Sequence, residues 1–563
     1  MLTNTTRMKK IITIALLSLF TFTQAQKGIK VTYLKSSNGT LIENQDPILL
    51  FTNKTETLLT SESIHKRKAK FPFEQSLIFR SDDKIMQITQ LQKTKSVTTI
   101  DSFSLGKQRF EFTNETKTIL GYKCKKAKTV INSNSIELWY TDDLKVKGAP
   151  TTLGQNLGLV LEMVRNGNYA ITATKVEKAK SVNPKQILDR NTTKSKAIDG
   201  LSYRDLVWKS RFTTIKVFEN ETINFSDKSK SNDSILKFAN GTLILKKVTF
   251  PEIKKGDLVF VDLLEQSQGD AYDRTGSVFM IPEDKKQSFL DGMQQGMKTL
   301  PVYENGNEKQ YQGVIATSEY TPLVELMRFF TPFGIKQYNH IQLKDKTWHE
   351  MVPYRAEITE LKVNLSGKSV YVGTFISNYD QGGHKVSLHI TINPSESKLD
   401  KTNFSLPLFN TMNVMEMASQ EYATMFNNEK GLEVYFVLDK DIKNAKLRYI
   451  TTGHGGWENG DEFVPKRNTI ILDGKEVFSF VPWRQDCGSY RLFNPASGNF
   501  NDGLSSSDLS RSNWCPGTVT NPNYIELGDL KAGTHTIQVK IPQGPNEGTS
   551  FSSWNVSGVL LGE

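Results

Sequence analysis

Short runs in which apolar and polar residues alternate fill residues 27–182. Leu138-Trp139-Tyr140 and Leu157-Gly158-Leu159-Val160-Leu161-Glu162-Met163 are two of them, and Asn, Gly and Ser separate the runs. Alternation with a period of two is typical of strands that bury one face, and Gly and Asn favour the turns between strands. The pattern predicts a separate β-rich N-terminal domain at residues 26–182.

A polar stretch follows at residues 183–209. It opens with Asn183-Pro184 and has Asn191-Thr192-Thr193-Lys194-Ser195-Lys196 at its middle. Polar clusters without periodicity indicate a connection, and the residue before a proline avoids the helical region. We therefore expect a linker here.

The β pattern returns at about Phe212 and continues to the C-terminus. Asn393-Pro394-Ser395 divides it into units at 210–394 and 395–563. Asp473-Gly474 predicts a two-residue hairpin turn in the second unit. The expected strands are Thr242–Phe250, Leu258–Leu264, Ser277–Ile281, Ser369–Ser377, Lys385–Ile392, Glu433–Leu438, Lys446–Thr451, Thr469–Leu472, Glu476–Phe480, Thr536–Ile541 and Trp554–Leu561. Two adjacent β-sandwiches are the simplest architecture for this pattern.

Helical spacing of apolar residues is rare. The best candidates for helices are Lys286–Lys298 and Val414–Phe426. The chain has 563 residues. A single hydrophobic core stops growing at about 250–300 residues, so the chain needs several cores. The fold class is therefore expected to be all-β, in several domains.

The N-terminus has the pattern of a secretory signal peptide, residues 1–25. Lys9-Lys10 precede the apolar run Ile11 to Thr21, and Thr23-Gln24-Ala25 supplies small residues for cleavage. The run is too short to span a bilayer, and no later segment is long enough. A lipoprotein would need cysteine where Gln26 stands. We expect a secreted or periplasmic protein with no membrane span.

Cysteine content and charge exclude two further classes. Three cysteines are too few for a disulfide scaffold in an exported protein of this size. Cys487 and Cys515 lie in one Gly/Ser/Asn-rich region and could close a long loop, and Cys124 is expected to be buried. The net charge of +11 comes from dispersed lysines without a clustered stripe, so no nucleic-acid partner is expected.

Two carboxylates in β-patterned regions are candidates for hydrolytic chemistry. Asp273 lies in Ala271-Tyr272-Asp273-Arg274, and Glu462 lies in Gly460-Asp461-Glu462-Phe463. A carboxylate in a dry cleft can have a raised pKa and act as a base toward water. By local sequence alone, Asp273 would be a turn aspartate and Glu462 a surface residue.

Further motifs occur with these two in a fixed order. They are Arg328-Phe329-Phe330-Thr331-Pro332-Phe333, Gly453-His454-Gly455 and Arg511-Ser512-Asn513-Trp514-Cys515-Pro516-Gly517. With Asp270-Ala271-Tyr272-Asp273-Arg274-Thr275-Gly276-Ser277-Val278-Phe279, the set resembles the peptide:N-glycosidase F family over roughly 210–562. Ordered agreement over such a span is more specific than one short motif.

The resemblance implies tandem eight-stranded jelly rolls and an amidase that cleaves the bond between an N-linked glycan and its asparagine. Such an enzyme converts the Asn to Asp and releases a glycosylamine. Its partners would be N-glycosylated proteins and glycopeptides, and we expect a monomer. The family needs no metal or organic cofactor, and the seven histidines of this chain show no ligand-like spacing.

Carried over position by position, the resemblance makes Asp273 the essential carboxylate at the scissile amide. Glu462 becomes the supporting carboxylate, which holds water and the sugar. The other side chains that match the family's cleft are Arg274, Arg511, His454, Tyr272 and Trp514. The arginines are expected to fix Asp273 or to stabilise charge on the carbonyl oxygen, and the aromatic rings to stack on a sugar. Cys487 and Cys515 match a family disulfide.

One departure concerns a third acidic residue of the family. Tyr371-Val372-Gly373-Thr374-Phe375 stands at that place, so Gly373 replaces the carboxylate and Phe375 replaces a tryptophan. We hypothesise that the glycine leaves room beside the innermost sugar and lets the site tolerate core α1,3-fucose. Glu416 or Glu421 is a candidate substitute for the lost acid.

Residues 118–127, 137–141 and 157–162 are similar to exported proteins of the GLPGLI family, whose function is obscure. This likeness implies an accessory domain for substrate or partner binding. Two alternatives to the amidase stay open at this stage. Loss of the third acid is compatible with a glycan-binding protein without turnover, and a glycoside hydrolase would also use two carboxylates, at a defined separation.

Overall fold

The structure, a computed structural model, describes residues 26–182, 195–338, 343–395, 401–412, 421–455, 460–495, 506–545 and 552–563. It divides into an N-terminal unit (Met1–Arg211) and a C-terminal unit (Phe212–Glu563). The expected signal peptide and Glu416 lie outside the described residues, as does most of the helix expected at Val414–Phe426. None of the helices in the described ranges is long and apolar enough to cross a membrane.

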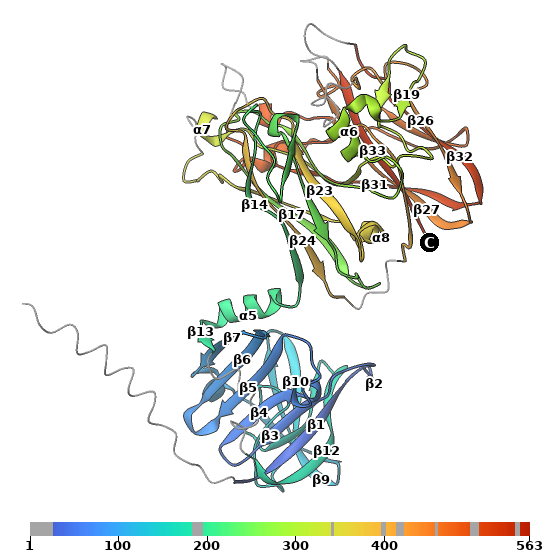
Figure 1. The fold of residues 1–563 in the computed structure, drawn as a ribbon. Helices are drawn as coiled ribbons and strands as arrows, with labels where there is room; N and C mark the ends of the chain where they lie inside the picture. The colour runs from blue at the N-terminus through green and yellow to red at the C-terminus, as the bar shows by residue number, and fades with distance from the viewer. Residues whose placement is uncertain are drawn as a thin grey trace, which may run out of the picture. The chain divides into compact units, whose positions relative to one another are not determined.

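The N-terminal unit is one large sheet (Figure 1). Its order is β13-β7-β6-β5-β4-β3-β1-β12-β11-β10-β9-β8, with β2 beside β1. The strands are β1 (Gln26–Ser37), β2 (Thr40–Leu41), β3 (Ile48–Thr52), β4 (Glu56–Ser61), β5 (Phe73–Phe79), β6 (Lys84–Gln92), β7 (Lys95–Asp101), β8 (Glu111–Ile119), β9 (Tyr122–Ile131), β10 (Asn134–Thr141), β11 (Leu159–Arg165), β12 (Tyr169–Val182) and β13 (Lys196–Ala197). Most neighbours are consecutive in the chain, so short turns connect them. Cys124 is free and buried in the core of this sheet, as expected.

The helices that accompany this sheet in residues 26–182 and 195–211 are α2 (Glu62–His65), α3 (Ser104–Lys107) and α5 (Gly200–Lys209). Asp199 caps α5 by accepting hydrogen bonds from the next backbone amides. Tyr203 and Val207 of α5 are buried against Leu91 and Val97. The segment expected as a linker at 183–209 therefore contains an ordered helix that packs on the N-terminal unit.

The C-terminal unit holds two β-sandwiches. The first pairs the sheet β14-β24-β17-β22 with the sheet β15-β16-β23-β18-β21-β30, and the second pairs β25-β33-β27-β31 with β26-β32-β28-β29. The elements are β14 (Thr213–Ile223), β15 (Leu236–Phe238), β16 (Leu243–Thr249), β17 (Leu258–Ser267), β18 (Thr275–Ile281), α6 (Phe289–Gln295), β19 (Val302–Tyr303), β20 (Tyr311–Gln312), β21 (Val324–Phe330), α7 (Ile335–Tyr338), β22 (Val352–Glu357), α8 (Lys362–Leu365), β23 (Ser369–Ile376), β24 (His384–Asn393), β25 (Phe404–Asn410), β26 (Leu432–Leu438), β27 (Ile442–His454), β28 (Asn468–Leu472), β29 (Lys475–Phe480), β30 (Val519–Thr520), β31 (Asn523–Leu530), β32 (Gly533–Lys540) and β33 (Ser553–Gly562).

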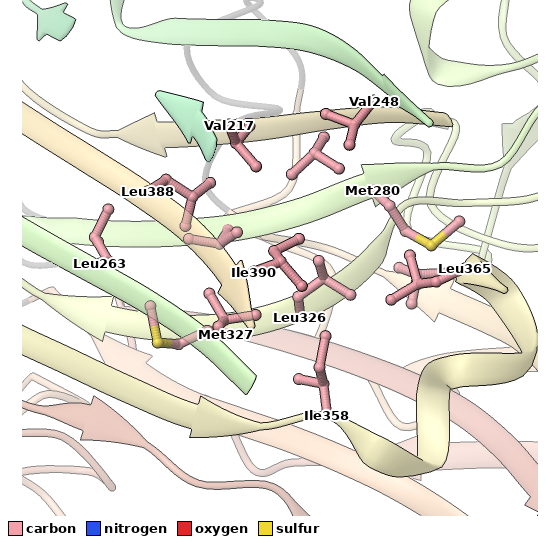
Figure 2. Close-up of a cluster of buried hydrophobic side chains, with 14 of the residues drawn as sticks. Val217, Val248, Leu263, Met280, Leu326, Met327, Ile358, Leu365, Leu388 and Ile390 are labelled. Atoms are coloured by element: carbon pink, nitrogen blue, oxygen red, sulfur yellow. The ribbon is translucent and has the colours of Figure 1, made fainter. Parts of the chain in front are cut away.

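The all-β fold is confirmed, and every strand expected in this unit is present within a few residues of its predicted ends. Alternate residues of facing sheets fill the core of the first sandwich, as Figure 2 shows for Val217, Leu263, Met280, Leu326 and Leu388. The predicted hairpin turn joins β28 to β29, with both of its central residues at positive φ. The helix expected at Lys286–Lys298 is present as α6.

Two buried arginines lock the sandwiches together. Arg328 on β21 pairs with Glu325 at 2.7 Å and donates to Thr452 Oγ1 and to the Asn555 carbonyl in the second sandwich. Arg448 on β27 donates in return to the carbonyls of Glu325 and Leu326. Both guanidinium groups are almost fully buried. Each sandwich therefore inserts a buried, charged side chain into the other, where it is hydrogen-bonded.

We expect Arg448→Met to lower the free energy of unfolding of the C-terminal unit by about 3–5 kcal/mol, because it removes the buried cation paired with Glu360 and the donor to two carbonyls. Urea unfolding of the purified protein measures this. The control is Arg355→Met, which removes an exposed pair with Asp262 and should cost about 1 kcal/mol or less. Equal losses in both variants would contradict a locking role for Arg448.

Candidate active site

Asp273 lies in the turn between β17 and β18. Thr331, which follows β21, holds this turn from two sides: its Oγ1 accepts from the Arg274 amide at 2.9 Å, and its own amide donates to the Arg274 carbonyl at 2.9 Å. The Gly334 amide donates to the Ala271 carbonyl at 3.0 Å. The 328–333 motif thus supplies the support for the Asp273 turn.

Arg274 does not bind Asp273 directly. Its guanidinium forms a bidentate ion pair with Asp270: Nε donates to Oδ2 at 2.7 Å and Nη2 donates to Oδ1 at 3.0 Å. The same guanidinium lies over the rings of Tyr272 and Tyr379, at 5.4 and 5.9 Å from their centroids. The fork that we expected around Asp273 is therefore formed with Asp270, a residue that sequence reasoning left without a role.

Glu462 lies in the loop that follows β27 in the second sandwich. Its amide donates to the Gly455 carbonyl at 3.3 Å, and its carbonyl accepts from the Ser512 amide at 2.9 Å. The preceding residue, Asp461, is fully buried and accepts from Trp554 Nε1 at 2.7 Å and from the Gly544 amide. Asp461 thereby anchors the loop in the sandwich while the next side chain points to the site.

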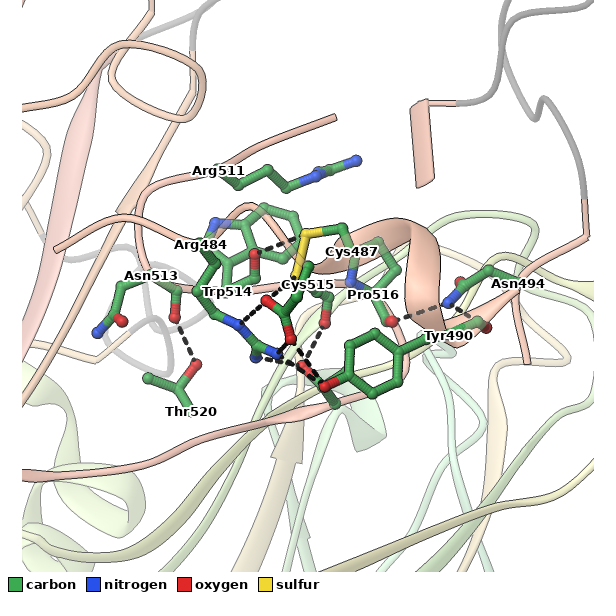
Figure 3. Close-up of a disulfide and its surroundings, with 12 residues drawn as sticks. Arg484, Cys487, Tyr490, Asn494, Arg511, Asn513, Trp514, Cys515, Pro516 and Thr520 are labelled. Atoms are coloured by element: carbon green, nitrogen blue, oxygen red, sulfur yellow. Dashed lines mark hydrogen bonds and ion pairs between the residues drawn. A yellow bond between two sulfur atoms is a disulfide. The ribbon is translucent and has the colours of Figure 1, made fainter. Parts of the chain in front are cut away.

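Arg511 brings the two carboxylates together. Its Nη1 lies 3.1 Å from Asp273 Oδ2 and also donates to Glu462 Oε1, and its Nη2 donates to the Ser506 carbonyl at 2.7 Å. Arg511 is 2% exposed and lies over the Trp514 ring, 4.4 Å from its centroid (Figure 3). One cation from the second sandwich therefore joins an acid of each sandwich.

Burial raises the pKa of Glu462 to about 7; the Arg511 cation opposes this shift and the Asp273 charge adds to it. Burial also raises the pKa of Asp273, against the cations of Arg511 and Arg274. Asp273 Oδ2 is buried at 3.1 Å from Arg511 Nη1 and accepts no hydrogen bond from the described residues. Because the two acids interact, their proton equilibria belong to the pair, and burial raises the pKa of both members.

The aromatic residues around the pair have different exposures. Trp514 is 4% exposed, stacks on Phe330 at 4.2 Å and donates to the Gly453 carbonyl, so it supports Arg511 and has no open face for a sugar. Tyr272 is 44% exposed, so a sugar ring can stack on it. His454 shares a 2.8 Å hydrogen bond with Thr452, and burial lowers its pKa to about 3, so its ring is neutral at physiological pH.

The Cys487–Cys515 disulfide is confirmed, with its Cα atoms 5.1 Å apart (Figure 3). Near it, Arg484 and Arg511 exchange two backbone hydrogen bonds of 2.9 and 3.0 Å. The disulfide ties these two segments together and so holds the backbone from which Arg511 reaches the carboxylates.

Three family models match this chain. Residues 31–205 match the model of the N-glycanase peptide N-terminal domain, residues 214–392 that of peptide-N-glycosidase F, N terminal, and residues 421–561 that of peptide-N-glycosidase F, C terminal. A solved structure of PNGF-II is 59% identical, covers 95% of this chain and 99% of its own, and superposes with a TM-score of 0.86. The chain belongs to the peptide-N-glycosidase F family.

A second crystal form of PNGF-II is also 59% identical, with a TM-score of 0.80 over 96% of this chain and 98% of that one. A recombinant peptide:N-glycanase F is 16% identical over 63% of this chain and 96% of that one, with a TM-score of 0.42. A comparison with curated proteins finds no match. Membership of the family, shown by the family models and by PNGF-II, makes the protein an amidase of the peptide:N-glycosidase type. The likeness of its N-terminal domain to GLPGLI proteins stays a prediction.

The expected roles of Gly373 and Phe375 are wrong. Gly373 pairs with Phe279 on β18, four residues beyond the start of a strand that begins after the Asp273 turn, at Thr275. A Cβ atom at Gly373 would lie 2.4 Å from Leu245 Cδ2 and 2.7 Å from Phe279 Cζ, and Phe375 is buried in the same core. The glycine allows close packing between strands and leaves no free volume beside a sugar. Of the two substitute acids, Glu421 accepts from Thr424 Oγ1 at 2.9 Å.

Several residues that shape the site were not found from sequence. Asp270 and Asp461 lie in motifs that were selected for other residues, Asp273 and Glu462. His384, which contacts Asp270, has no local signal, because only the pairing of β24 with β17 brings it to the turn.

We expect Gly373→Ala to destabilise the protein by about 1–3 kcal/mol through overpacking against Leu245 and Phe279, without changing the ratio of rates on plain and core-fucosylated glycopeptides. Thermal unfolding and release assays measure the two effects. The control is Gly488→Ala, whose new methyl would meet Asp508 only at an ordinary contact distance. Native stability of Gly373→Ala together with altered selectivity for fucosylated glycopeptides would show that Gly373 lines the site.

Proposed function

We propose that this enzyme hydrolyses the amide that joins the innermost sugar of an N-glycan to asparagine, with Asp273 and Glu462 as its catalytic carboxylates. The bridge of both acids by Arg511 is the observation that carries the proposal. It joins two buried carboxylates, both with raised pKa values, at the junction of two sandwiches. Such a group suits proton transfer at neutral pH.

Asp273 acts as the base. Its carboxylate, whose side chain is 14% exposed, accepts a proton from water while the water oxygen bonds to the amide carbon. The C–N bond then breaks, and the proton passes from Asp273 to the leaving nitrogen. The products are a glycosylamine and a peptide in which Asp replaces Asn. One carboxylate thus serves first as base and then as acid, and no outside reactant other than water is consumed.

Glu462 and Arg511 hold the reacting groups. In its ionised form Glu462 can accept hydrogen bonds from water and from a sugar hydroxyl. Arg511 fixes both carboxylates, and its rigid seat on Trp514 keeps them in one geometry. Tyr272, half exposed beside Asp273, offers the apolar face on which a sugar ring can stack.

The substrates are N-glycosylated proteins and glycopeptides, which an exported enzyme with residues 1–25 as its signal peptide would meet outside the cytoplasm. A glycan-binding protein without turnover was suggested by Gly373 alone, and the place of Gly373 in the core removes that reason. Tolerance of core α1,3-fucose stays a prediction that the release assay addresses directly.

Asp273→Ala should abolish glycan release, and Glu462→Ala should reduce kcat/KM by roughly 100-fold or more, because each removes an acid of the bridged pair. Incubation with a denatured N-glycoprotein in heavy-oxygen water measures this, since the product Asp carries the label. The control is Glu526→Gln, which alters an exposed acid paired with Lys446 and should leave the rate unchanged.

Near-native turnover of Asp273→Ala would discard the assignment of the base. Product peptide that retains a sugar would show a glycoside hydrolase instead, and tight binding with no mass change would show a glycan-binding module.

Because the pKa of Glu462 is about 7, kcat/KM should rise about tenfold per pH unit up to about 7 and level off above it. The raised pKa also means that the folded state binds this proton more tightly than the unfolded one. The contribution of Glu462 to the free energy of unfolding is therefore present below its ordinary value of 4.5 and falls as pH rises to about 7. Rate profiles and urea unfolding across this range measure both. If the rate profile of Glu462→Gln still showed an ionisation near pH 7, that ionisation would belong to another group.

A further inference from the structure

His384, the first residue of β24, lies fully buried between two carboxylates. Its Nδ1 is 2.8 Å from Glu265 Oε1 on β17, and its Nε2 is 3.3 Å from Asp270 Oδ2 in the turn that carries Asp273. The side chains of His384 and Glu265 are 0% exposed, and that of Asp270 is 2% exposed. A ring with a carboxylate at each nitrogen satisfies both contacts only when both nitrogens carry protons.

The surroundings keep this ring charged. Burial alone would lower the pKa of His384, but its bonds to Asp270 and Glu265 outweigh burial and raise the pKa to about 9. Burial by itself raises the pKa of Asp270. The hydrogen bonds from His384 and Arg274 outweigh burial and hold this pKa well below its usual range. The other titratable group at hand is Tyr354 on β22, whose hydroxyl donates to the Phe330 carbonyl and whose pKa is raised by burial and then by Glu265.

Asp270 is the centre of the turn. Its Oδ1 accepts from the Tyr272 amide at 3.2 Å, its carbonyl accepts from Ser267 Oγ at 2.6 Å, and both carboxylate oxygens bind Arg274. The orientation of the Asp273 side chain therefore depends on the position of the Asp270 carboxylate. Without the imidazolium, two buried carboxylates would face one another with a neutral ring between them.

We propose that His384 is a positioning residue for the amidase. Its imidazolium clamps Asp270 to Glu265, and this clamp orients the turn so that Asp273 meets Arg511 and Glu462. Loss of the His384 proton releases the clamp and sets an alkaline limit to activity that neither catalytic carboxylate produces. The inference rests on the proposed function, because it assigns His384 to the same reaction.

The strand supplies a matched control. His389 lies five positions along β24 and pairs with Glu219 at 2.6 Å, but it is partly exposed and far from the turn. Substitution of His389 removes a histidine–carboxylate pair from the same strand without touching Asp270. Two variants of His384 separate its contacts: the amide of Gln can replace Nε2 toward Asp270, and the shorter amide of Asn can replace Nδ1 toward Glu265.

The test is steady-state release from an N-glycopeptide between about pH 7 and about pH 10, with wild type, His384→Asn, His384→Gln and His389→Gln. For wild type and His389→Gln we expect kcat to fall about tenfold per pH unit above about 9. At pH 8, His384→Asn should lose about 10- to 100-fold in kcat with KM within about twofold, because misplacement of Asp273 affects the chemical step. His384→Gln should lose less, and neither variant should retain the alkaline limit.

An alkaline limit that survives in folded His384→Gln, or a native kcat in His384→Asn, would overturn the proposal. Circular dichroism and thermal unfolding establish folding. If neither variant folds, wild type decides: one of its seven histidines should titrate near pH 9 by NMR, together with kcat, and a flat rate profile would refute the clamp. Absence of release by wild type at every pH would count against the proposed function, not against the clamp.

Discussion

The site depends on one buried guanidinium shared by two acids that come from different sandwiches. Arg511 contacts Asp273 of the first sandwich and Glu462 of the second, and both contacts run through the same nitrogen. A geometry of this kind can exist only if the sandwiches cannot slide past one another. Arg328 and Arg448, each buried in the partner sandwich, supply that rigidity because a buried charge tolerates no loss of its partners.

Burial has opposite consequences for reactivity and for stability here. Removing Asp273 and Glu462 from water raises their pKa values, which makes them useful at neutral pH. The same desolvation penalises their charged forms in the folded state. The surrounding packing offsets this cost: Trp514 stacks on Phe330 and under Arg511, and the Cys487–Cys515 disulfide holds the segment from which Arg511 extends.

Each catalytic candidate has a buried aspartate beside it that does no chemistry. Asp270 precedes Asp273 by three residues, and its carboxylate binds Arg274, His384 and the Tyr272 amide. Asp461 precedes Glu462 and binds Trp554 and the Gly544 amide. The division is physical: a buried acid that is hydrogen-bonded within its own loop fixes that loop, whereas Asp273 and Glu462 keep 14% and 19% of their side chains exposed and can meet a ligand.

The strands and their sandwich arrangement could be predicted from the amino-acid sequence, whereas the two acids were singled out by the likeness of their motifs to a known family. Alternation of apolar residues is a local property, so β16 to β18 and β26 to β29 could be located without any knowledge of their partners. Register is not local. Only the tertiary structure decided that Gly373 faces Phe279 in a core, that Arg274 serves Asp270, and that His384 reaches a turn more than a hundred residues earlier in the chain. These contacts depend on which strands pair and on how far each is shifted, and pairing is fixed by packing across the whole sandwich.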